Sequence, residues 1–486
     1  MKKILLLIGI LFFCNTSNAE KYPNSWKMEI ECKDRGNKWW EASYVVEVVD
    51  NKFSVSFDEK WNWMKDIVFE GKIEKNKVTI KQTFKHFEHS GEGRGFYKGK
   101  IKDNNAKLKG YRKFKDWDSI SCKGNFFKVD KLPMFASLEY LDNASREIIE
   151  FTSYDPVGAI NIINKTYKNS PSKISGELLL PPNGDNIPVV VVIHSSGGPS
   201  EFTNVSQWTW RNGFNNELLK NNIGIFQIDS FTGRGVKNTH EDQSTVSMHA
   251  GEMDAFQALK LLSNHPRVDA TRLGITGLSR GGMASFQVTE KRFSDAVLGA
   301  DRYFKASLPM ATDCYMRFEQ PLMTPTKTLF LLGSEDDYTP AEGCINWVND
   351  VKASQEDTVD VEVLVKDGWV HDFYGDYPIE ICSSCVVFNN EACQAFLPNG
   401  LVFNNKGLPA KDMENFILEN KGQKTYDELI EIFSSPDATW GNAWEYYYEI
   451  YKTLYLSCAS KGPKIGGDHA QETIDIAVPF FVEALK

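Results

Sequence analysis

A short motif, Gly277-Leu278-Ser279-Arg280-Gly281, limits the architecture of this chain more than any other stretch. Residues 272–276 before it predict a short buried strand, and the small and apolar residues 282–288 after it predict a helix. A serine between a strand and a helix lies on a sharp, strained turn, and the flanking glycines let the two elements approach closely. We therefore expect Ser279 to be presented at the end of a sheet strand.

Strands and helices alternate over roughly 200 residues around this motif. The run 187–193 is almost continuously apolar, which is typical of a parallel strand buried on both faces. Further strands are expected at 174–180, 223–228, 273–276, 305–308, 328–332 and 361–365, and helices at 249–262, 341–351 and 474–485. This alternation predicts an α/β fold with a doubly wound, mostly parallel sheet.

The first residues have the pattern of a secretory signal peptide: Lys2 and Lys3, an apolar run over 4–13, and small residues ending at Ala19. We expect residues 1–19 to be removed and the protein to be periplasmic or secreted. The apolar run is too short to span a bilayer, so no integral membrane segment is expected afterwards. Lipid attachment through Cys14 is an alternative that the bulky residues before it disfavour.

Residues 20–130 are expected to form a separate all-β module. Short runs of alternating apolar and polar residues, punctuated by turns, predict a small β-barrel or sandwich. Residues 21–130 hold 24 Lys and Arg against 17 Asp and Glu, whereas the whole chain has a net charge of −10. This difference in charge supports two modules, although an excess of lysine is more often a solvated face than a binding surface.

The remainder is expected to be one α/β domain over residues 173–486, joined by a connecting segment, 131–172, with helical character around 145–151. The strand spacing breaks at about 376–468, where Pro, Asn and Cys clusters precede aromatic helical patterns around 440–455. We interpret this stretch as an insertion that caps the functional site.

Removal of the signal leaves eight cysteines, an even number that predicts disulfides in an oxidising compartment. Cys32 and Cys122 lie in the first and last strands of the β-module, where a bond would link its ends. The other six are Cys314 and Cys344 in the α/β domain, and Cys382, Cys385, Cys393 and Cys458 near the end, whose pairing stays open. A redox or zinc role for the Cys-x-x-Cys pair is disfavoured, because it follows a proline-rich loop rather than opening a helix.

A serine hydroxyl is a poor nucleophile at neutral pH, so it needs a histidine base and a carboxylate that orients the histidine. The strand at 328–332 ends in a loop with carboxylates at the sheet edge where such folds build their sites. Within that loop we favour Asp336 over Glu335 and Asp337. His371 follows the next strand and is the expected base, with His469 as its competitor.

A reaction at an acyl carbon also needs N–H donors for the developing oxyanion. One donor is expected from the backbone of Arg280, the residue after the serine, and the other from the backbone of Ser196, after the strand 187–193. His194 is expected to shape that loop rather than to act as a base, because it precedes the serine in the chain.

Several motifs together resemble the dienelactone hydrolase family of the α/β-hydrolase superfamily, in a serine-nucleophile variant. They are Ile193-His194-Ser195-Ser196-Gly197-Gly198, residues 229–235 and 265–269, the Ser279 motif, residues 333–340, and His371-Asp372-Phe373. The resemblance implies an α/β-hydrolase fold, a Ser279, Asp336 and His371 triad, and a disulfide between Cys314 and Cys344 beside the site. The name-giving enzymes use a cysteine nucleophile and lack the β-module and the insertion.

The leading hypothesis is an exported serine hydrolase that cleaves small-molecule carboxylic esters through an acyl-enzyme, without a cofactor, metal or nucleic-acid partner. Arg234 is a candidate for binding a substrate carboxylate, with a structural salt bridge as the alternative. A peptidase of the prolyl oligopeptidase type is a second hypothesis, although the first 150 residues contain no propeller repeat. A third is a non-catalytic envelope binding protein on the same scaffold. The acyl and alcohol groups and the oligomeric state stay open.

Overall fold

The computed structural model describes residues 25–34, 37–47, 51–57, 64–86, 92–102, 105–114, 119–128, 138–202, 208–240, 243–355, 358–375, 377–383, 385, 402–408, 410–437, 440 and 462–486. The expected signal peptide and Cys14 lie outside these residues. The chain divides into two compact units, Met1–Ser137 and Leu138–Lys486. Each unit is described by itself.

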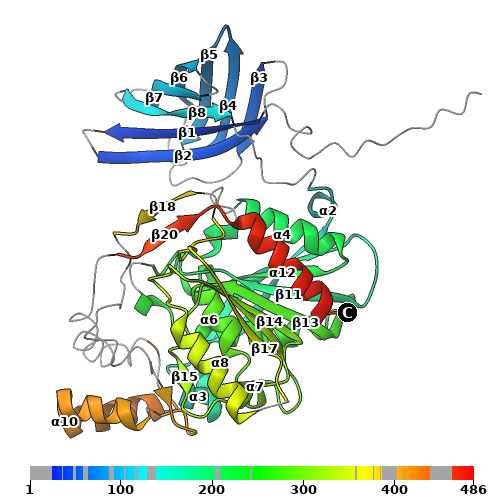
Figure 1. Ribbon diagram of the computed structural model, residues 1–486, viewed down its shortest axis with the longest axis vertical. Helices are drawn as coiled ribbons and strands as arrows, with labels where there is room; N and C mark the ends of the chain where they lie inside the picture. The colour runs from blue at the N-terminus through cyan, green and yellow to red at the C-terminus, as the bar shows by residue number, and fades with distance from the viewer. Residues whose placement is uncertain are drawn as a thin grey trace, which may run out of the picture. The chain divides into compact units, whose positions relative to one another are not determined.

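The first unit is a single antiparallel sheet of eight strands (Figure 1). The strands are β1 Ser25–Asp34, β2 Asn37–Glu47, β3 Lys52–Phe57, β4 Met64–Glu74, β5 Lys77–His86, β6 Glu92–Lys102, β7 Asn105–Phe114 and β8 Ile120–Lys128. Their order is β2-β1-β8-β7-β6-β5-β4-β3, so the meander rolls up until its first strand pairs with its last. The all-β module is thus confirmed, as a barrel-like rolled sheet.

The ends of this rolled sheet are joined covalently. Cys32 of β1 lies directly opposite Cys122 of β8, and the two form a disulfide across 90 residues of chain. Both cysteines are buried with apolar residues such as Met28 and Ile30. The expected pairing is confirmed.

The second unit is built on a mixed eight-stranded sheet. Its strands are β9 Ser145–Tyr154, β10 Pro171–Leu180, β11 Ile187–Ile193, β12 Gly224–Asp229, β13 Val268–Leu278, β14 Ala306–Met310, β16 Lys327–Gly333 and β17 Val361–Lys366. The order is β17-β16-β14-β13-β11-β12-β10-β9, with β10 antiparallel to both of its neighbours and all other pairs parallel. This sheet confirms the mostly parallel α/β-hydrolase fold.

The expected helical character around 145–151 is wrong, because this segment is the edge strand β9. Ile149 and Phe151 pack against the core, whereas Glu150 between them and Ile148 before them are exposed, Ile148 by 68%. This alternation is the period of a strand. The segment expected to connect two domains therefore contributes a strand to the sheet of the second unit.

Helices cover both faces of this sheet (Figure 1). They are α4 Trp208–Lys220, α5 Ala250–Leu262, α6 Arg280–Gln287, α7 Lys291–Val297, α8 Glu342–Ser354 and α12 Ala470–Ala484. A side chain at Gly274 of β13 would meet Phe481 of α12, while the next residue, Ile275, joins the core with Met253 and Phe256 of α5. Successive residues of a strand point to opposite faces, so α12 and α5 lie on opposite sides of the sheet.

The stretch expected as an insertion leaves and re-enters the second unit at one place. Its first strand, β18 (Tyr377–Ile381), pairs antiparallel with its last, β20 (Lys464–Gly467). Between them, the helical segment α10 (Lys411–Ser434) lies against α3 (Ala159–Ile163), where the Asn161 amide donates to the carbonyl of Phe433 at 3.0 Å. The expected aromatic helix beyond residue 440, Cys393 and Cys458 lie outside the described residues.

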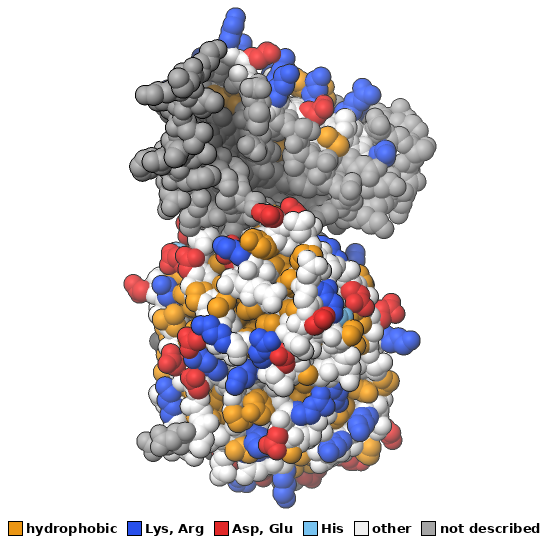
Figure 2. Space-filling model, turned by 90° about the vertical axis from the view of Figure 1, so that its right-hand side faces the viewer, with side chains coloured by type: hydrophobic (Ala, Val, Ile, Leu, Met, Phe, Trp, Pro, Cys, Tyr) orange, Lys and Arg blue, Asp and Glu red, His pale blue; other side chains and the backbone are white. Residues whose placement is uncertain are grey.

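Two further disulfides join Cys314 to Cys344 and Cys382 to Cys385. No helix within the described ranges is long and apolar enough to cross a membrane. On the face of the second unit turned to the viewer in Figure 2, acidic and basic side chains are interspersed. That face therefore presents no extended field of one sign.

We predict that the β1–β8 disulfide stabilises the first unit substantially. Closing a loop of this length lowers the conformational entropy of the unfolded chain, which stabilises the folded state by about 4.6 kcal/mol in the loop-entropy treatment. Replacing Cys32 and Cys122 together by alanine should therefore speed hydrogen exchange at the amides of β1 and β8, with β11 and β13 of the second unit as the internal control. Unchanged exchange in β1 and β8 would contradict this assignment.

Candidate active site

The turn between β13 and α6 holds Ser279 in a conformation that few non-glycine residues adopt, with φ 53° and ψ −114°. A Cβ atom on Gly281 would lie 2.2 Å from the carbonyl oxygen of Ile193, and one on Gly277 would lie 2.4 Å from the carbonyl carbon of Gly281. Side chains at either glycine would therefore force strand and helix apart. The expected strained turn is present, and the Ser279 N–H donates to Met310 at 3.0 Å.

Three side chains from three loops meet at this turn. His371, after β17, has its Nε2 atom 2.9 Å from Ser279 Oγ. Its Nδ1 atom lies 3.0 Å from Oδ2 of Asp336, which follows β16. All three residues are buried, with 8%, 2% and 5% exposure for Ser279, His371 and Asp336. The arrangement forms a continuous hydrogen-bonded path from the carboxylate to the hydroxyl.

The loop after β16 fixes the Asp336 carboxylate from its other side. The N–H groups of Tyr338 and Thr339 donate to Oδ1 at 2.9 and 2.8 Å, and the Thr339 hydroxyl donates to Oδ2 at 2.8 Å. The same hydroxyl lies 3.0 Å from His371 Nδ1. Thr339 was not identified from the sequence, although a hydroxyl residue three positions after an aspartate in a turn is a usable signal.

The environment of His371 controls when it can accept a proton. Burial opposes the charged imidazolium most strongly, but the carboxylates of Asp336, Asp372 and Asp313, with Asp336 first among them, together outweigh burial. The pKa of His371 is therefore raised above its ordinary value near 6.5.

The competitor histidine lies elsewhere. His469 precedes α12, stacks on the Trp369 ring with centroids 4.8 Å apart, and has Nδ1 3.2 Å from Glu472. Its N–H donates to the carbonyl of Phe373. His371, and not His469, contacts the Ser279 hydroxyl.

Backbone donors flank the serine on two sides. Arg280 is the first residue of α6, so its N–H has no acceptor within the helix. Ser196 follows β11, and its carbonyl accepts from Thr239 at 2.8 Å. Over the described ranges, neither the Ser196 nor the Arg280 N–H donates to a backbone carbonyl. Both groups are available to an oxyanion.

Side chains behind these donors form a polar network that the sequence did not reveal. The Arg280 guanidinium is buried and donates to the carbonyls of Val246 and Ser247 and, at 2.9 Å, to Gln243 Oε1. The Gln243 amide in turn donates to Ser196 Oγ at 2.8 Å. Gln243 thus links the two loops that carry the candidate donors, from a segment with no recognisable motif.

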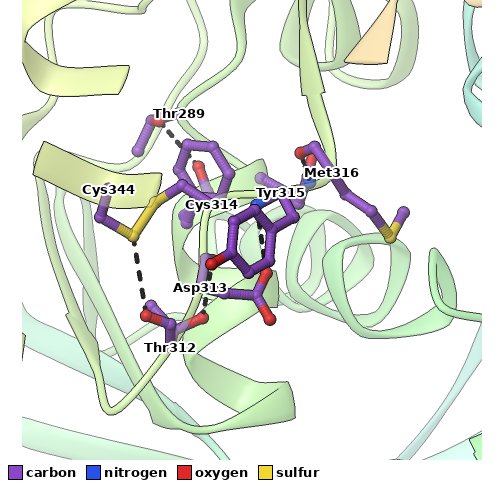
Figure 3. The surroundings of a disulfide bond; sticks show 9 residues. Thr289, Thr312, Asp313, Cys314, Tyr315, Met316 and Cys344 are labelled. Carbon is purple, nitrogen blue, oxygen red and sulfur yellow. Dashed lines mark hydrogen bonds between the residues drawn. A yellow bond between two sulfur atoms is a disulfide. The ribbon is translucent and has the colours of Figure 1, made fainter. Parts of the chain in front are cut away.

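The Cys314–Cys344 disulfide lies next to Asp313, which follows β14 (Figure 3). Since β14 lies between β13 and β16 in the sheet, this loop lies beside the loops that carry Ser279 and Asp336. Asp313 accepts from the Tyr315 N–H at 3.1 Å, and burial raises its pKa to about 6. The pairing that the resemblance implied is confirmed.

Arg234 is enclosed by carboxylates of the protein itself. Its Nη atoms donate to both oxygens of Asp254, at 2.8 and 2.9 Å, and its Nε donates to Asp155 at 2.6 Å. A further bond goes to the carbonyl of Ser230, and the side chain is 5% exposed. This geometry favours the structural salt bridge over the substrate-binding alternative.

The part of the chain that the structure describes contains no group of three or more His, Cys, Asp and Glu residues placed to hold a metal ion.

We predict that Arg234→Met lowers stability rather than substrate affinity. The change leaves the Asp254 carboxylate buried without a partner, and breaking a buried ion pair typically costs about 3–5 kcal/mol. Denaturant unfolding should show this loss, while KM for an ester that carries a free carboxylate, measured where the variant is folded, should stay at the wild-type value. A large rise in KM with unchanged stability would instead assign Arg234 to substrate binding.

The family model of the dienelactone hydrolase family matches residues 174–396. No curated protein matches the sequence. Similar solved structures include a putative dienelactone hydrolase from Klebsiella pneumoniae, 17% identical, with a TM-score of 0.33, covering 48% of this chain and 90% of that one. A hyperthermophilic esterase from Pyrobaculum calidifontis is 14% identical, with a TM-score of 0.32, covering 50% of this chain and 82% of that one. Residues 174–396 of this chain thus match the sequence pattern of the dienelactone hydrolase family.

Proposed function

We propose that this protein is an exported serine hydrolase that cleaves carboxylic esters by way of an acyl-enzyme. The observation that carries the proposal is the hydrogen-bonded path from Asp336 through His371 to the strained Ser279. Membership of a family named for ester hydrolysis supports the reaction class. Export is supported by the disulfides, which form and persist in oxidising compartments.

In the first step, Ser279 Oγ attacks the ester carbonyl and His371 Nε2 accepts the hydroxyl proton. The imidazolium that forms carries its second proton on Nδ1, which donates to Asp336. Asp336 stabilises this cation and keeps the ring in the orientation that faces Ser279. The Thr339 hydroxyl and two backbone N–H groups keep Asp336 in place throughout.

Attack converts the carbonyl oxygen to an oxyanion, for which Ser196 and Arg280 supply backbone N–H donors. Collapse of the tetrahedral intermediate breaks the bond to the alcohol oxygen, and His371 returns its proton to that oxygen. Water, deprotonated by His371, then attacks the acyl-enzyme; the bond from the acyl carbon to Ser279 Oγ breaks, His371 returns the proton to Oγ, and the acid is released. In this sequence Arg234 has a structural role, and the insertion at about 376–468 acts as the cap.

We predict that fluorophosphonate labels the purified protein at Ser279. Ser279→Ala should abolish labelling and lower the rate of ester hydrolysis by roughly 10⁴-fold or more, because the nucleophile is lost. His371→Ala should lower kcat to a similar extent, whereas the matched variant His469→Ala should keep most of it.

Absence of labelling at Ser279 would contradict the proposal. Loss of activity in His469→Ala alone would overturn the assignment of the base. Labelling accompanied by peptide cleavage without ester cleavage would favour a peptidase of the prolyl oligopeptidase type.

We also predict the direction of the pH dependence. His371 acts as a base only when neutral, so with its raised pKa, activity should fall as the pH drops through that value. Asp313→Asn removes a negative charge that favours the imidazolium, so the acidic limb of the kcat/KM profile should move to lower pH. Asp337→Asn is the control, since Asp337 accepts from the Lys464 N–H and is not a cause of the raised pKa. An unmoved limb in Asp313→Asn would contradict this account.

A further inference from the structure

Glu201 is a buried carboxylate that the reaction sequence above does not use. It lies in a short 3-10 helix, Pro199–Phe202, and is 8% exposed. Its Oε2 accepts from the Ser195 N–H at 2.8 Å, and its Oε1 accepts from the Ser195 hydroxyl. No Lys, Arg or His in the described segments forms an ion pair with this carboxylate. Its side-chain contacts are therefore directed at the loop after β11.

Three consecutive backbone N–H groups in that loop differ in their hydrogen-bond acceptors. The first, on Ser195, donates to Glu201 directly. The third, on Gly197, donates at 3.1 Å to the Ser195 hydroxyl, which itself donates to Glu201. The middle one, on Ser196, donates to no backbone carbonyl in the described ranges. Glu201 thus holds the groups on both sides of the N–H that is left for the oxyanion.

The direction of the middle N–H follows from the planarity of the peptide bond. The Ser195 carbonyl oxygen accepts from the Gly198 N–H at 3.1 Å and lies 2.8 Å from His194 Nδ1. In a trans peptide the carbonyl and the following N–H point in opposite directions, so fixing the oxygen of Ser195 fixes the N–H of Ser196. Rotation of this peptide would break those bonds and disturb Ser195, which Glu201 holds.

We propose that Glu201 is a positioning residue for ester hydrolysis: through Ser195 and Gly197 it orients the Ser196 N–H toward the oxyanion of the tetrahedral intermediate. The proposal rests on the proposed function, because it requires Ser279 to form that intermediate. It assigns Glu201 an effect on the transition state and none on ground-state binding of the ester.

The cost of burying this carboxylate is consistent with such a role. Burial raises the pKa of Glu201 to about 7, and the negative charge of Asp372 acts in the same direction. The hydrogen bonds from Ser195 and Gly197 act against this rise. Replacing a buried charged side chain by an apolar one of similar volume often leaves a protein as stable as before or makes it more stable. Stability alone therefore does not account for a carboxylate at this position. The fit is also close, since a Cβ atom on Gly197 would lie 2.2 Å from Glu201 Oε1.

The test is steady-state kinetics on the full-length protein with a neutral p-nitrophenyl ester. Glu201→Ala should lower kcat by about 10- to 100-fold, the range expected when an oxyanion donor is displaced rather than removed. KM should change by less than about twofold, because binding of the ground state does not use this donor. Glu201→Gln should lose less, since it keeps an acceptor for the Ser195 N–H.

Glu290 provides a matched control. Glu290 precedes the first residue of α7 and is 6% exposed, and burial raises its pKa to about 7. Its carboxylate accepts from the backbone N–H groups of Arg292 and Leu322. Glu290→Ala should lower the unfolding temperature while leaving kcat per folded molecule unchanged. Gly197→Ala would place a methyl group against the Glu201 carboxylate and displace it from Ser195. This variant should therefore reproduce the kcat loss of Glu201→Ala.

An unchanged kcat in Glu201→Ala, or a rise in KM with kcat preserved, would overturn the proposal. Should Glu201→Ala fail to fold, unchanged kcat in both Glu201→Gln and Gly197→Ala would overturn it as well. A wild-type protein without esterase activity and without fluorophosphonate labelling would instead contradict the proposed function. The two failures are therefore distinguishable.

Discussion

The site depends on the close approach of the first turn of α6 to the end of β11. Gly281 permits it, because any larger residue would collide with the carbonyl of Ile193. The same approach brings the start of α6, with the Arg280 N–H, beside the loop that begins at His194. One packing contact between a helix and a strand thus sets both the strained serine and the two candidate donors next to it. The parallel strands β14, β16 and β17 end at the same edge of the sheet, so Asp313, Asp336 and His371, which follow them, lie close to Ser279.

Carboxylates dominate the surroundings of His371, and each is constrained differently. Asp336 is held by three hydrogen bonds and faces the imidazole, while Asp313 and Asp372 raise the pKa of His371 from positions outside the triad. Glu201 is not a cause of that shift and instead accepts from the backbone N–H of Ser195. The Arg234 guanidinium forms its ion pairs with Asp254 and Asp155, which are not part of the triad. In the proposed mechanism the imidazole, which contacts the Ser279 hydroxyl, is the group that exchanges protons with it.

The sequence predicted the framework well, because buried parallel strands are continuous apolar runs and their ends carry the functional side chains. Residues 187–193 form the predicted strand, and His371 and Asp336 meet Ser279 although 35 or more residues separate each from its partner. The edge strand β9 was mistaken for a helix, because Ile148, Ile149 and Phe151 fit both periodicities until pairing with β10 selects one. Glu201 and Gln243 were missed because their contacts are made between loops and no local pattern encodes them, whereas Thr339 follows Asp336 at a spacing that turn chemistry could have identified. The role of the insertion depends on tertiary packing that composition alone does not specify.

In the proposed mechanism, Ser279 becomes covalently acylated by an ester substrate. The most direct measurement is rapid acid quenching of the wild-type protein during turnover of a p-nitrophenyl ester, followed by peptide mapping by mass spectrometry. We expect an added acyl mass on the peptide that contains Ser279, and its absence from Ser279→Ala. Turnover with the acyl group on a residue other than Ser279 would contradict this mechanism. So would turnover in which no acylated peptide is found, either in the wild type or in the His371→Ala variant, which lacks the base for deacylation.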